Sequence, residues 1–393
     1  MIGQRLRQLR LARGMTMEDL VEATGGLITK QSISKYELGK ANPMASTLAA
    51  LSKALDVKTS SLVSEPKYEI QFIAYRKANS TSQKTLEEVE AKVRTVLENR
   101  ILVRDLICNF DTPDIPQIPV HSLEDAEAAA QEVRRVWGIG DNPIPNLIDA
   151  IEAHNIDVIP IPVESGFDGV SARAFGPQKQ LRGAALVSRV AISGARQRFN
   201  LAHELGHQVL IPDASIDEEK AAHRFSGAFL VPASRLIKEL GTKRDSIHIK
   251  ELLLIKKQFG VSVQALFYRM KDLSIISDNY YKFLSIEWNK AGFKRTEPEE
   301  TEIEEPRIFK QYIYRAYAEK LIKHDQAEKM LGETFDLGPK AEAPESLLLT
   351  LLRLPKSDRA KMLKQQAESV KDLYKHGSSL DTTDLYSGEL SHA

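Results

Sequence analysis

Residues 198–207 read R-F-N-L-A-H-E-L-G-H and place two histidines four residues apart in an apolar, helix-compatible segment. On a helix, residues four apart share a face, so His203 and His207 can present both imidazoles to one metal ion. A zinc ion activates water near neutral pH, and the carboxylate of Glu204 can move the proton. The spacing thus indicates a zinc site with hydrolytic chemistry. The alternative is a pair of surface histidines on an amphipathic helix.

Length and composition limit the classes of protein that the chain can represent. A chain of 393 residues is long enough for two or three domains. Its 54 basic residues balance 54 acidic ones, so any nucleic-acid surface must be local. Cys108 is the one cysteine, which excludes an internal disulfide and a cysteine zinc cluster and fits a buried thiol in a reducing compartment. Without a long apolar run or a signal peptide, we expect a cytoplasmic protein.

Residues 1–66 have the pattern of five short helices. Leu6 and Leu9 recur at helical spacing in the first helix, and Thr16 and Thr29 are suitable N-caps for the second and third. Helices two and three would then form a helix-turn-helix. The alternative is a helical protein-interaction module that makes no DNA contact.

The outer face of the third predicted helix carries side chains that can read a major groove. Gln31 can pair bidentately with adenine, while Lys30 and Lys35 can reach guanine or phosphate. Ser32 can bond either kind of group, and Arg10 of the first helix is expected to contact DNA without reading sequence. We therefore expect operator binding by a homodimer, with half-sites about 10 base pairs apart.

Two strings in this region carry a family resemblance: I-G-x-R-L-R-x-L-R-x-x-R-G-M-T at residues 2–16 and S-I-S-K-Y-E-L-G-K-A-N-P at residues 32–43. They closely resemble the XRE, or lambda-repressor-like, DNA-binding domain. Met17 departs from the glutamine that is usual in that family, where it makes a phosphate or base contact, so that contact is not carried over.

Residues 67–119 are predicted to connect the first domain to the metal motif. A strand-like run at Tyr68–Tyr75 precedes a charged connecting or dimerising helix at Ser82–Ile107. The prolines in Asp111–Val120 make a stiff linker and the best domain boundary in the chain.

The metal motif falls in a predicted domain at residues 120–295. Helices come first, followed by a strand at Val158–Val163, a turn into a second strand at Phe167–Ala172, and a third strand at Ala184–Val187. Two prolines in the first of these strands place it at a sheet edge. We expect a mainly α protein whose small β-sheet stands beside the motif helix, forming a wall along which an extended peptide can lie.

A third metal ligand must come from beyond the motif. A metzincin-type site would need glycine at position 210 and histidine at position 213, but the chain has Leu210 and Asp213. The next helix offers four candidates: Asp217, Glu218, Glu219 and His223.

Four segments resemble the ImmA/IrrE family of zinc metallopeptidases: I-P-N-L-I at 144–148, F-D-G-V-S-A at 167–172, R-Q-R-F-N-L-A-H-E-L-G-H at 196–207, and E-K-A-A-H-R-F-S-G-A-F-L-V-P at 219–232. The resemblance implies a zincin-like α+β domain with a gluzincin-like site. In that site Glu219 joins His203 and His207 as a ligand of zinc, or alternatively manganese, and Glu204 is catalytic. Ala221 and His223 replace the family's usual Glu and Asn.

The remainder of the chain matches no motif. The acidic run at 297–305 is predicted to be a solvated linker, residues 306–376 a helical region, and residues 377–393 a disordered tail.

Two functions fit these features. One is a DNA-binding transcriptional regulator whose zinc endopeptidase domain cleaves a repressor or antitoxin-like protein. The other is a transcription factor or antitoxin in which the peptidase-like domain is a sensor or interaction platform and hydrolyses nothing.

Overall fold

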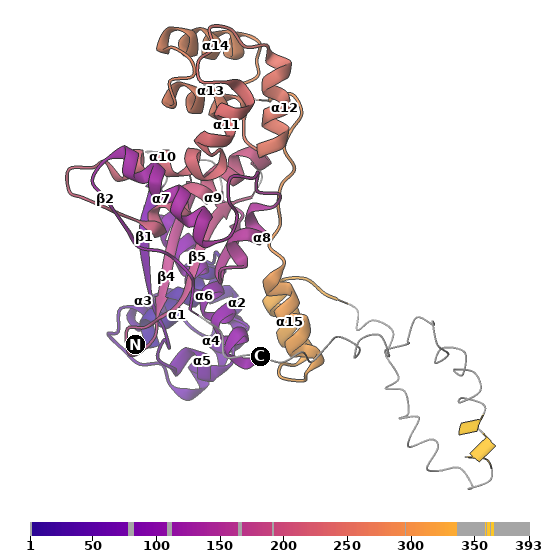
Figure 1. The fold of residues 1–393 in the computed structure, drawn as a ribbon. Coiled ribbons are helices and arrows are strands. Elements are labelled where there is room, and N and C mark those ends of the chain that lie inside the picture. The colour runs from indigo at the N-terminus through magenta and orange to yellow at the C-terminus, as the bar shows by residue number, and fades with distance from the viewer. Residues whose placement is uncertain are drawn as a thin grey trace. The chain divides into compact units, whose positions relative to one another are not determined.

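The structure is a computed structural model of the 393-residue chain (Figure 1). It describes residues 2–77, 82–107, 112–163, 167–190, 192–294 and 296–335, together with 358, 360, 361, 363 and 364. The chain divides into two compact units, Met1–Leu331 and Gly332–Ala393. None of the described helices is long and apolar enough to cross a membrane.

The first five helices form a bundle around their own hydrophobic core. Leu6, Leu20, Ile33 and Leu51 are fully buried in it. Thr16 caps the second helix in a capping box with Asp19, as expected of a threonine at that position. The predicted five-helix arrangement is therefore confirmed. The helices are α1 (Ile2–Ala12), α2 (Met17–Ala23), α3 (Lys30–Glu37), α4 (Ala45–Ala54) and α5 (Thr59–Val63).

The predicted small sheet is present, and it contains one strand more than expected. Within the described residues, four strands pair in the order β1-β4-β5-β3. The strands are β1 (Glu69–Lys77), β3 (Ile156–Ile161), β4 (Phe167–Phe175) and β5 (Leu181–Arg189). The expected turn at Phe167–Ala172 is wrong, since β4 already begins at Phe167. The proline-containing strand β3 does lie at an edge. The extra strand, β1, confirms the strand-like run predicted at Tyr68–Tyr75, but it pairs with β4 instead of only connecting two domains.

Helix α6 (Gln83–Ile107) packs against the sheet along its apolar stripe. Val89, Val93 and Leu97 are buried with Val170 and Ala172 of β4 in one cluster. The stripe predicted to connect or dimerise is thus used inside the same chain. Periodicity shows that a helix has an apolar face but does not identify the surface that covers it.

A second core surrounds the helix that contains the metal motif, α9 (Gly194–Val209). Leu201 and Leu205 of α9 are buried there with residues of the surrounding helices. Phe259 and Leu266, from the two helices that follow farther along the chain, lie in the same core. The other helices of this region are α7 (Leu123–Val136), α8 (Leu147–Glu152), α10 (Glu218–Leu230), α11 (Ala233–Leu240), α12 (Ile249–Phe259), α13 (Val263–Asp272) and α14 (Asp278–Lys290). A two-stranded parallel pair joins β2 (Ile118–Val120) to β6 (Leu210–Pro212).

The acidic segment at 297–305, predicted to be a solvated linker, has five exposed residues but is anchored to the protein surface by two of its glutamates, which the prediction did not include. Glu297 accepts hydrogen bonds from Lys256 Nζ at 2.8 Å and from the backbone N–H of Val263, at the start of α13, at 3.0 Å. Glu304 pairs with buried Arg198 and accepts from the N–H of Ile148 in the first turn of α8 at 2.9 Å. Carboxylates are stabilised at helix N-termini and beside a buried cation.

After this segment the chain forms α15 (Ile308–Ala318) and α16 (His324–Leu331). They form the first part of the helical region predicted at 306–376, and the described residues 358, 360, 361, 363 and 364 are also helical. The predicted thiol of Cys108 and the tail at 377–393 lie outside the described residues.

Candidate metal centre and nucleic-acid interface

Helix α9 holds the metal motif in a buried position. Ser193 caps the helix, and His203 and Glu204 are 0% and 1% exposed. Gly206, inside the motif, allows α10 to approach closely, since a Cβ at this position would lie 3.3 Å from Ala222 Cα. The short Gly206 contact brings the start of α10 beside the two histidines.

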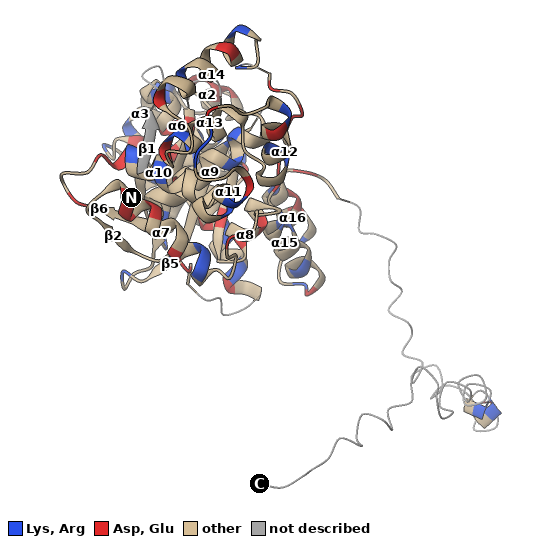
Figure 2. Cartoon of the chain, turned by 45° about the horizontal axis from the view of Figure 1, so that its top comes forward, with Lys and Arg blue, Asp and Glu red and all other residues tan. Residues whose placement is uncertain are grey.

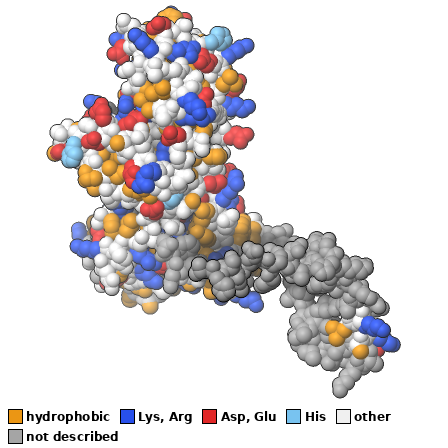
Figure 3. Space-filling model, viewed as in Figure 1, with side chains coloured by type: hydrophobic (Ala, Val, Ile, Leu, Met, Phe, Trp, Pro, Cys, Tyr) orange, Lys and Arg blue, Asp and Glu red, His pale blue; other side chains and the backbone are white. Residues whose placement is uncertain are grey.

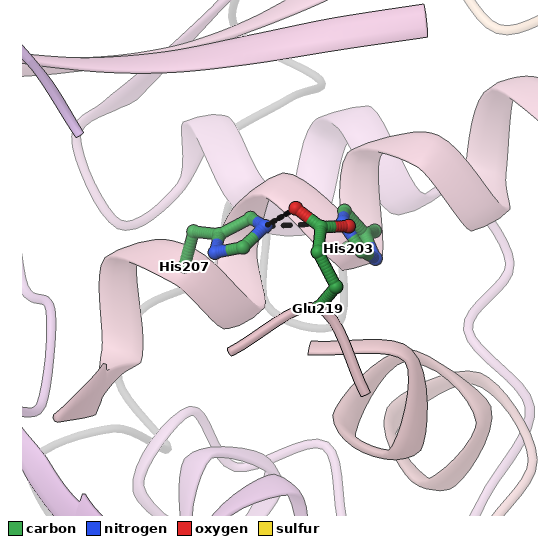
Figure 4. A group of neighbouring side chains, drawn as sticks. All are labelled: His203, His207 and Glu219. Carbon is green, nitrogen blue, oxygen red and sulfur yellow. Dashed lines mark hydrogen bonds and ion pairs between the residues drawn. The ribbon is translucent and has the colours of Figure 1, made fainter. Parts of the chain in front are cut away.

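Three donor groups converge from α9 and α10 (Figure 4). The Nε2 atoms of His203 and His207 are 3.1 Å apart, and the carboxylate oxygens of Glu219 lie 3.3 Å from the first and 3.4 Å from the second. Ligands at about 2.0–2.1 Å from a tetrahedral zinc ion lie about 3.3 Å from one another. Two imidazole nitrogens and one carboxylate at this separation therefore fit a zinc ion with one position left for water.

The first turn of α10 explains why Glu219, among the candidates, reaches the histidines. Asp217 is the N-cap, and its side chain accepts a hydrogen bond from the backbone of Lys220. His223 lies one turn beyond Glu219 and packs its ring against that of His203, with centroids 4.8 Å apart. Among the described residues, the cluster that could hold a metal comprises His203, His207 and Glu219, without His223.

Strand β4 runs along α9 and supports the motif from the other side. Glu204 lies against Gly169, where a Cβ would come 2.7 Å from Glu204 Oε1. Asn200 donates to the carbonyl of Asp168 at 3.2 Å, and Gln208 donates to the carbonyl of Ala172 at 3.2 Å. The motif helix is therefore fixed to the strand at three successive turns.

Several of these supporting residues were not among the predicted site residues. Gly169 was quoted only within a family segment, although a glycine inside a strand indicates close approach of another group. Arg173 donates to Gln208 Oε1 at 2.8 Å, and burial lowers the pKa of its guanidinium. Arg196 forms an ion pair with Asp168 at 2.6 Å. No local sequence signal identifies these long-range partners.

A cavity of about 720 Å³ opens beside the metal centre. Phe199, Asn200 and His223 line it on the side of the histidines. Tyr268 of α13 and Glu300 of the acidic segment line other parts of it. The space is of a size that accommodates large side chains, and its lining mixes aromatic and charged groups.

The third helix of the N-terminal bundle presents the predicted DNA-reading residues at the surface. Gln31 and Lys35 are exposed, as is Lys30, which pairs with exposed Glu18 of α2. Ser32 is half-buried, and its backbone N–H donates to the side chain of the N-cap threonine. Three of the four predicted DNA-reading side chains of α3 are thus exposed and accessible to a groove of DNA.

Charge is mixed over the described residues that the two views show. Basic and acidic residues are interspersed along the helices (Figure 2) and over the visible face in the space-filling view (Figure 3). Two further arginines of α1 are engaged by α6, where Arg5 pairs with Glu98 and Arg7 pairs with Glu87, each at 2.7 Å. These two arginines are therefore paired with acidic side chains of the same chain.

Arg10 does not belong to a DNA-binding surface, which corrects the expectation that it contacts DNA. Its side chain is 7% exposed and makes two hydrogen bonds to Glu37, at 2.7 and 2.9 Å, and one to the carbonyl of Met15 at 2.7 Å. It joins α1 to the end of α3. From the sequence alone Arg10 looks like an exposed residue of a charged helix, because the partner that buries it, Glu37, lies 27 residues away.

We expect Arg10→Ala to destabilise the N-terminal bundle by about 3–5 kcal/mol, because it leaves the buried carboxylate of Glu37 without its cation. Arg7→Ala is a matched control: it removes an arginine of the same helix whose ion pair with Glu87 of α6 is exposed, and it should cost about 0–1 kcal/mol. Hydrogen exchange of α1 and α3 in urea measures both. Equal protection in the two variants would contradict the structural role of Arg10.

Comparison with known proteins finds two separate regions of similarity, one over the N-terminal bundle and one over α9 and α10. A family model described as Helix-turn-helix matches residues 6–62, and one described as IrrE N-terminal-like domain matches residues 192–271. Over 63 residues the chain is 40% identical to the SPbeta prophage-derived uncharacterized HTH-type transcriptional regulator YonR of Bacillus subtilis (strain 168). That match covers 16% of this chain and 56% of the relative.

The chain spans about half the length of this relative. It carries an XRE-like helix-turn-helix domain of the transcription-regulator type and an ImmA/IrrE-like domain that contains both α9 and α10.

Proposed function

We propose that this protein is a DNA-binding transcriptional regulator whose ImmA/IrrE-like domain is a zinc-dependent endopeptidase, and that it cleaves a repressor or antitoxin-like protein. The observation that carries the proposal is the convergence of His203, His207 and Glu219 at separations that suit zinc, with Glu204 beside them on the same helix. Manganese is the alternative metal.

Each residue of the proposed centre would have a separate role in hydrolysis. Zinc held by His203, His207 and Glu219 would polarise a peptide carbonyl and lower the pKa of a bound water. Glu204 is buried against β4 on the helix that carries both histidines, and it would take a proton from the attacking water and deliver it to the departing amine. Gly169 keeps the space that the Glu204 carboxylate occupies. The cavity lined by Phe199 and Tyr268 would accept a substrate side chain next to the scissile bond.

The DNA-binding part of the proposal rests on α3. A homodimer would place two such helices about one turn of DNA apart, on a palindromic operator. Removal of residues 2–66 should therefore abolish operator binding, while the metal centre, which draws its ligands from α9 and α10, should remain.

Gln31→Ala is expected to weaken operator binding by about 1–3 kcal/mol, because a bidentate contact to adenine is lost. The loss should be specific for one base position, whereas Lys35→Ala should weaken binding to all sequences and lower its salt dependence. Gel-shift titrations on operators substituted base by base separate the two effects. If Gln31→Ala left both affinity and base preference unchanged, α3 would not be the reading helix.

The rival function, a metal- or metabolite-binding platform, makes a different prediction for the same protein. A platform would regulate the operator in cells equally well with Glu204 or with glutamine at this position, and no target would be cut. A reporter for the operator, measured together with the intact mass of the suspected target, separates the two functions.

A further inference from the structure

Strand β1 occupies one backbone edge of β4. The sheet order β1-β4-β5-β3 places β5 on the other edge. β1 is antiparallel to β4, with Glu69 opposite Phe175 at one end and Lys77 opposite Phe167 at the other. Both edges of β4 are thus paired within the chain, and Figure 1 shows β1 and β4 side by side.

Strand β4 is also the strand that lies against the proposed catalytic residue. Gly169 contacts Glu204, and the carbonyls of Asp168 and Ala172 accept hydrogen bonds from α9. An extended peptide binds a sheet by adding a strand to an exposed edge. Neighbouring strands lie about 4.8 Å apart, so a peptide added outside β1 would lie one whole strand farther from Glu204 than a peptide added to β4.

We propose that β1 holds the peptide-binding edge of β4 and that its second half, from Ala74 to Lys77, must leave before an extended polypeptide can bind there. The ligand is an extended segment that forms antiparallel backbone hydrogen bonds with β4 between Phe167 and Ser171. That this ligand is also a substrate rests on the proposed peptidase function, whereas its binding at the edge of β4 does not depend on that function.

The first half of β1 is anchored to α6. Ile70 is 4% exposed, and its carbonyl accepts a hydrogen bond from Arg94 Nη1 at 2.7 Å. The guanidinium of Arg94 also lies over the ring of Phe72, 4.9 Å from its centroid. Residues 69–72 pair with β4 in unbroken register.

The second half of β1 pairs less regularly. The register shifts between Phe72 and Ala74 and again between Tyr75 and Lys77. Each such irregularity leaves a residue unpaired and disrupts the ladder. The half opposite Val170 and Phe167 can therefore separate from β4 while the anchored half stays in place.

The test measures peptide binding in full-length Glu204→Gln protein that also carries Cys108→Ser. The probe is a fluorescein-labelled synthetic peptide with the sequence E-I-Q-F-I-A-Y-R-K, a copy of residues 69–77. Tyr75→Cys with Val170→Cys locks the second half, because opposite residues of antiparallel strands have Cα atoms about 4.5–5.5 Å apart, within the span of a disulfide. Tyr75→Pro opens it, since proline disrupts strand pairing.

Tyr75→Pro should bind the probe about tenfold or more tightly than the parent, because the tethered strand competes at high effective concentration. Oxidation of the 75/170 lock should remove binding, and reduction should restore it. The control pair Glu69→Cys with Phe175→Cys locks the anchored half, so its oxidation should change nothing. Equal affinity in the oxidised, reduced and proline forms, or no binding in any of them, would overturn the proposal.

None of these readouts depends on hydrolysis. If the probe binds as expected but zinc-loaded protein with Glu204 intact cuts no target, the peptidase proposal fails while the peptide-binding edge stands. Thermal unfolding of the proline variant shows whether its fold is intact, and the reversible lock supplies the result if it is not.

Discussion

Glu219→Ala should remove most of the bound metal, because it takes away one of three protein ligands and the only negative charge among them. Two imidazoles four residues apart would remain, and such a pair holds zinc far more weakly than three ligands with a carboxylate. Metal analysis after gel filtration at low micromolar protein should give close to one zinc per chain for the parent and a small fraction of that for the variant.

His223→Ala is the matched control, because its ring packs on His203 without being a ligand in this geometry. Loss of such a neighbour typically lowers metal affinity by about 10- to 100-fold, so metal should be retained at saturating zinc. Retention in the Glu219 variant with loss in the His223 variant would reverse the choice of third ligand.

Glu204→Gln should abolish hydrolysis and leave metal content, fold and operator binding unchanged. Glutamine keeps the size of the side chain beside Gly169 but cannot accept the proton of a water. General base catalysis of this kind contributes about 10²- to 10⁴-fold to rate, enough to bring a slow peptidase below detection. Cleavage rate, zinc content and operator affinity should be measured on one preparation.

Two results would count against this role. Residual cleavage within about threefold of the parent would show that Glu204 is not the base. Loss of zinc in Glu204→Gln would show that the carboxylate supports the centre structurally, since it is not among the three residues that converge on the metal position.

The features predicted correctly from the sequence are local ones. The helices of the N-terminal bundle follow from apolar spacing and from caps such as Thr16, and the motif helix follows from His203 and His207 at i and i+4. Asp217 could also have been set aside as a ligand, because an aspartate directly before a helix is a common N-cap.

Apart from the turn expected at Phe167–Ala172, the expectations that the structure corrects concern partners far away in sequence. β1 pairs Glu69 with Phe175, more than 100 residues later, and alternating residues give no information about which strand lies alongside. The acidic residues Glu297 and Glu304 meet a buried lysine and a buried arginine of α12 and α9. Arg10 finds its carboxylate on another helix. In each case the sequence pattern identifies a charged or amphipathic segment, and tertiary packing determines which residues contact that segment.

The position of Glu219 illustrates the limit for the metal centre. The residues after the motif offered several acidic candidates, and family resemblance chose among them. The structure adds the physical reason: Asp217 caps α10, Gly206 lets that helix approach α9, and Glu219 in the first turn then reaches both imidazoles.

The most direct test of the central claim is the intact mass of a candidate target after incubation with this protein. Zinc-loaded parent and Glu204→Gln should be incubated in parallel with each repressor or antitoxin-like protein encoded beside the gene. We expect the parent to convert one of these proteins into two fragments whose masses sum to the target plus one water, and the variant to leave it whole. Intact targets with both forms, at one zinc per chain, would contradict the peptidase function.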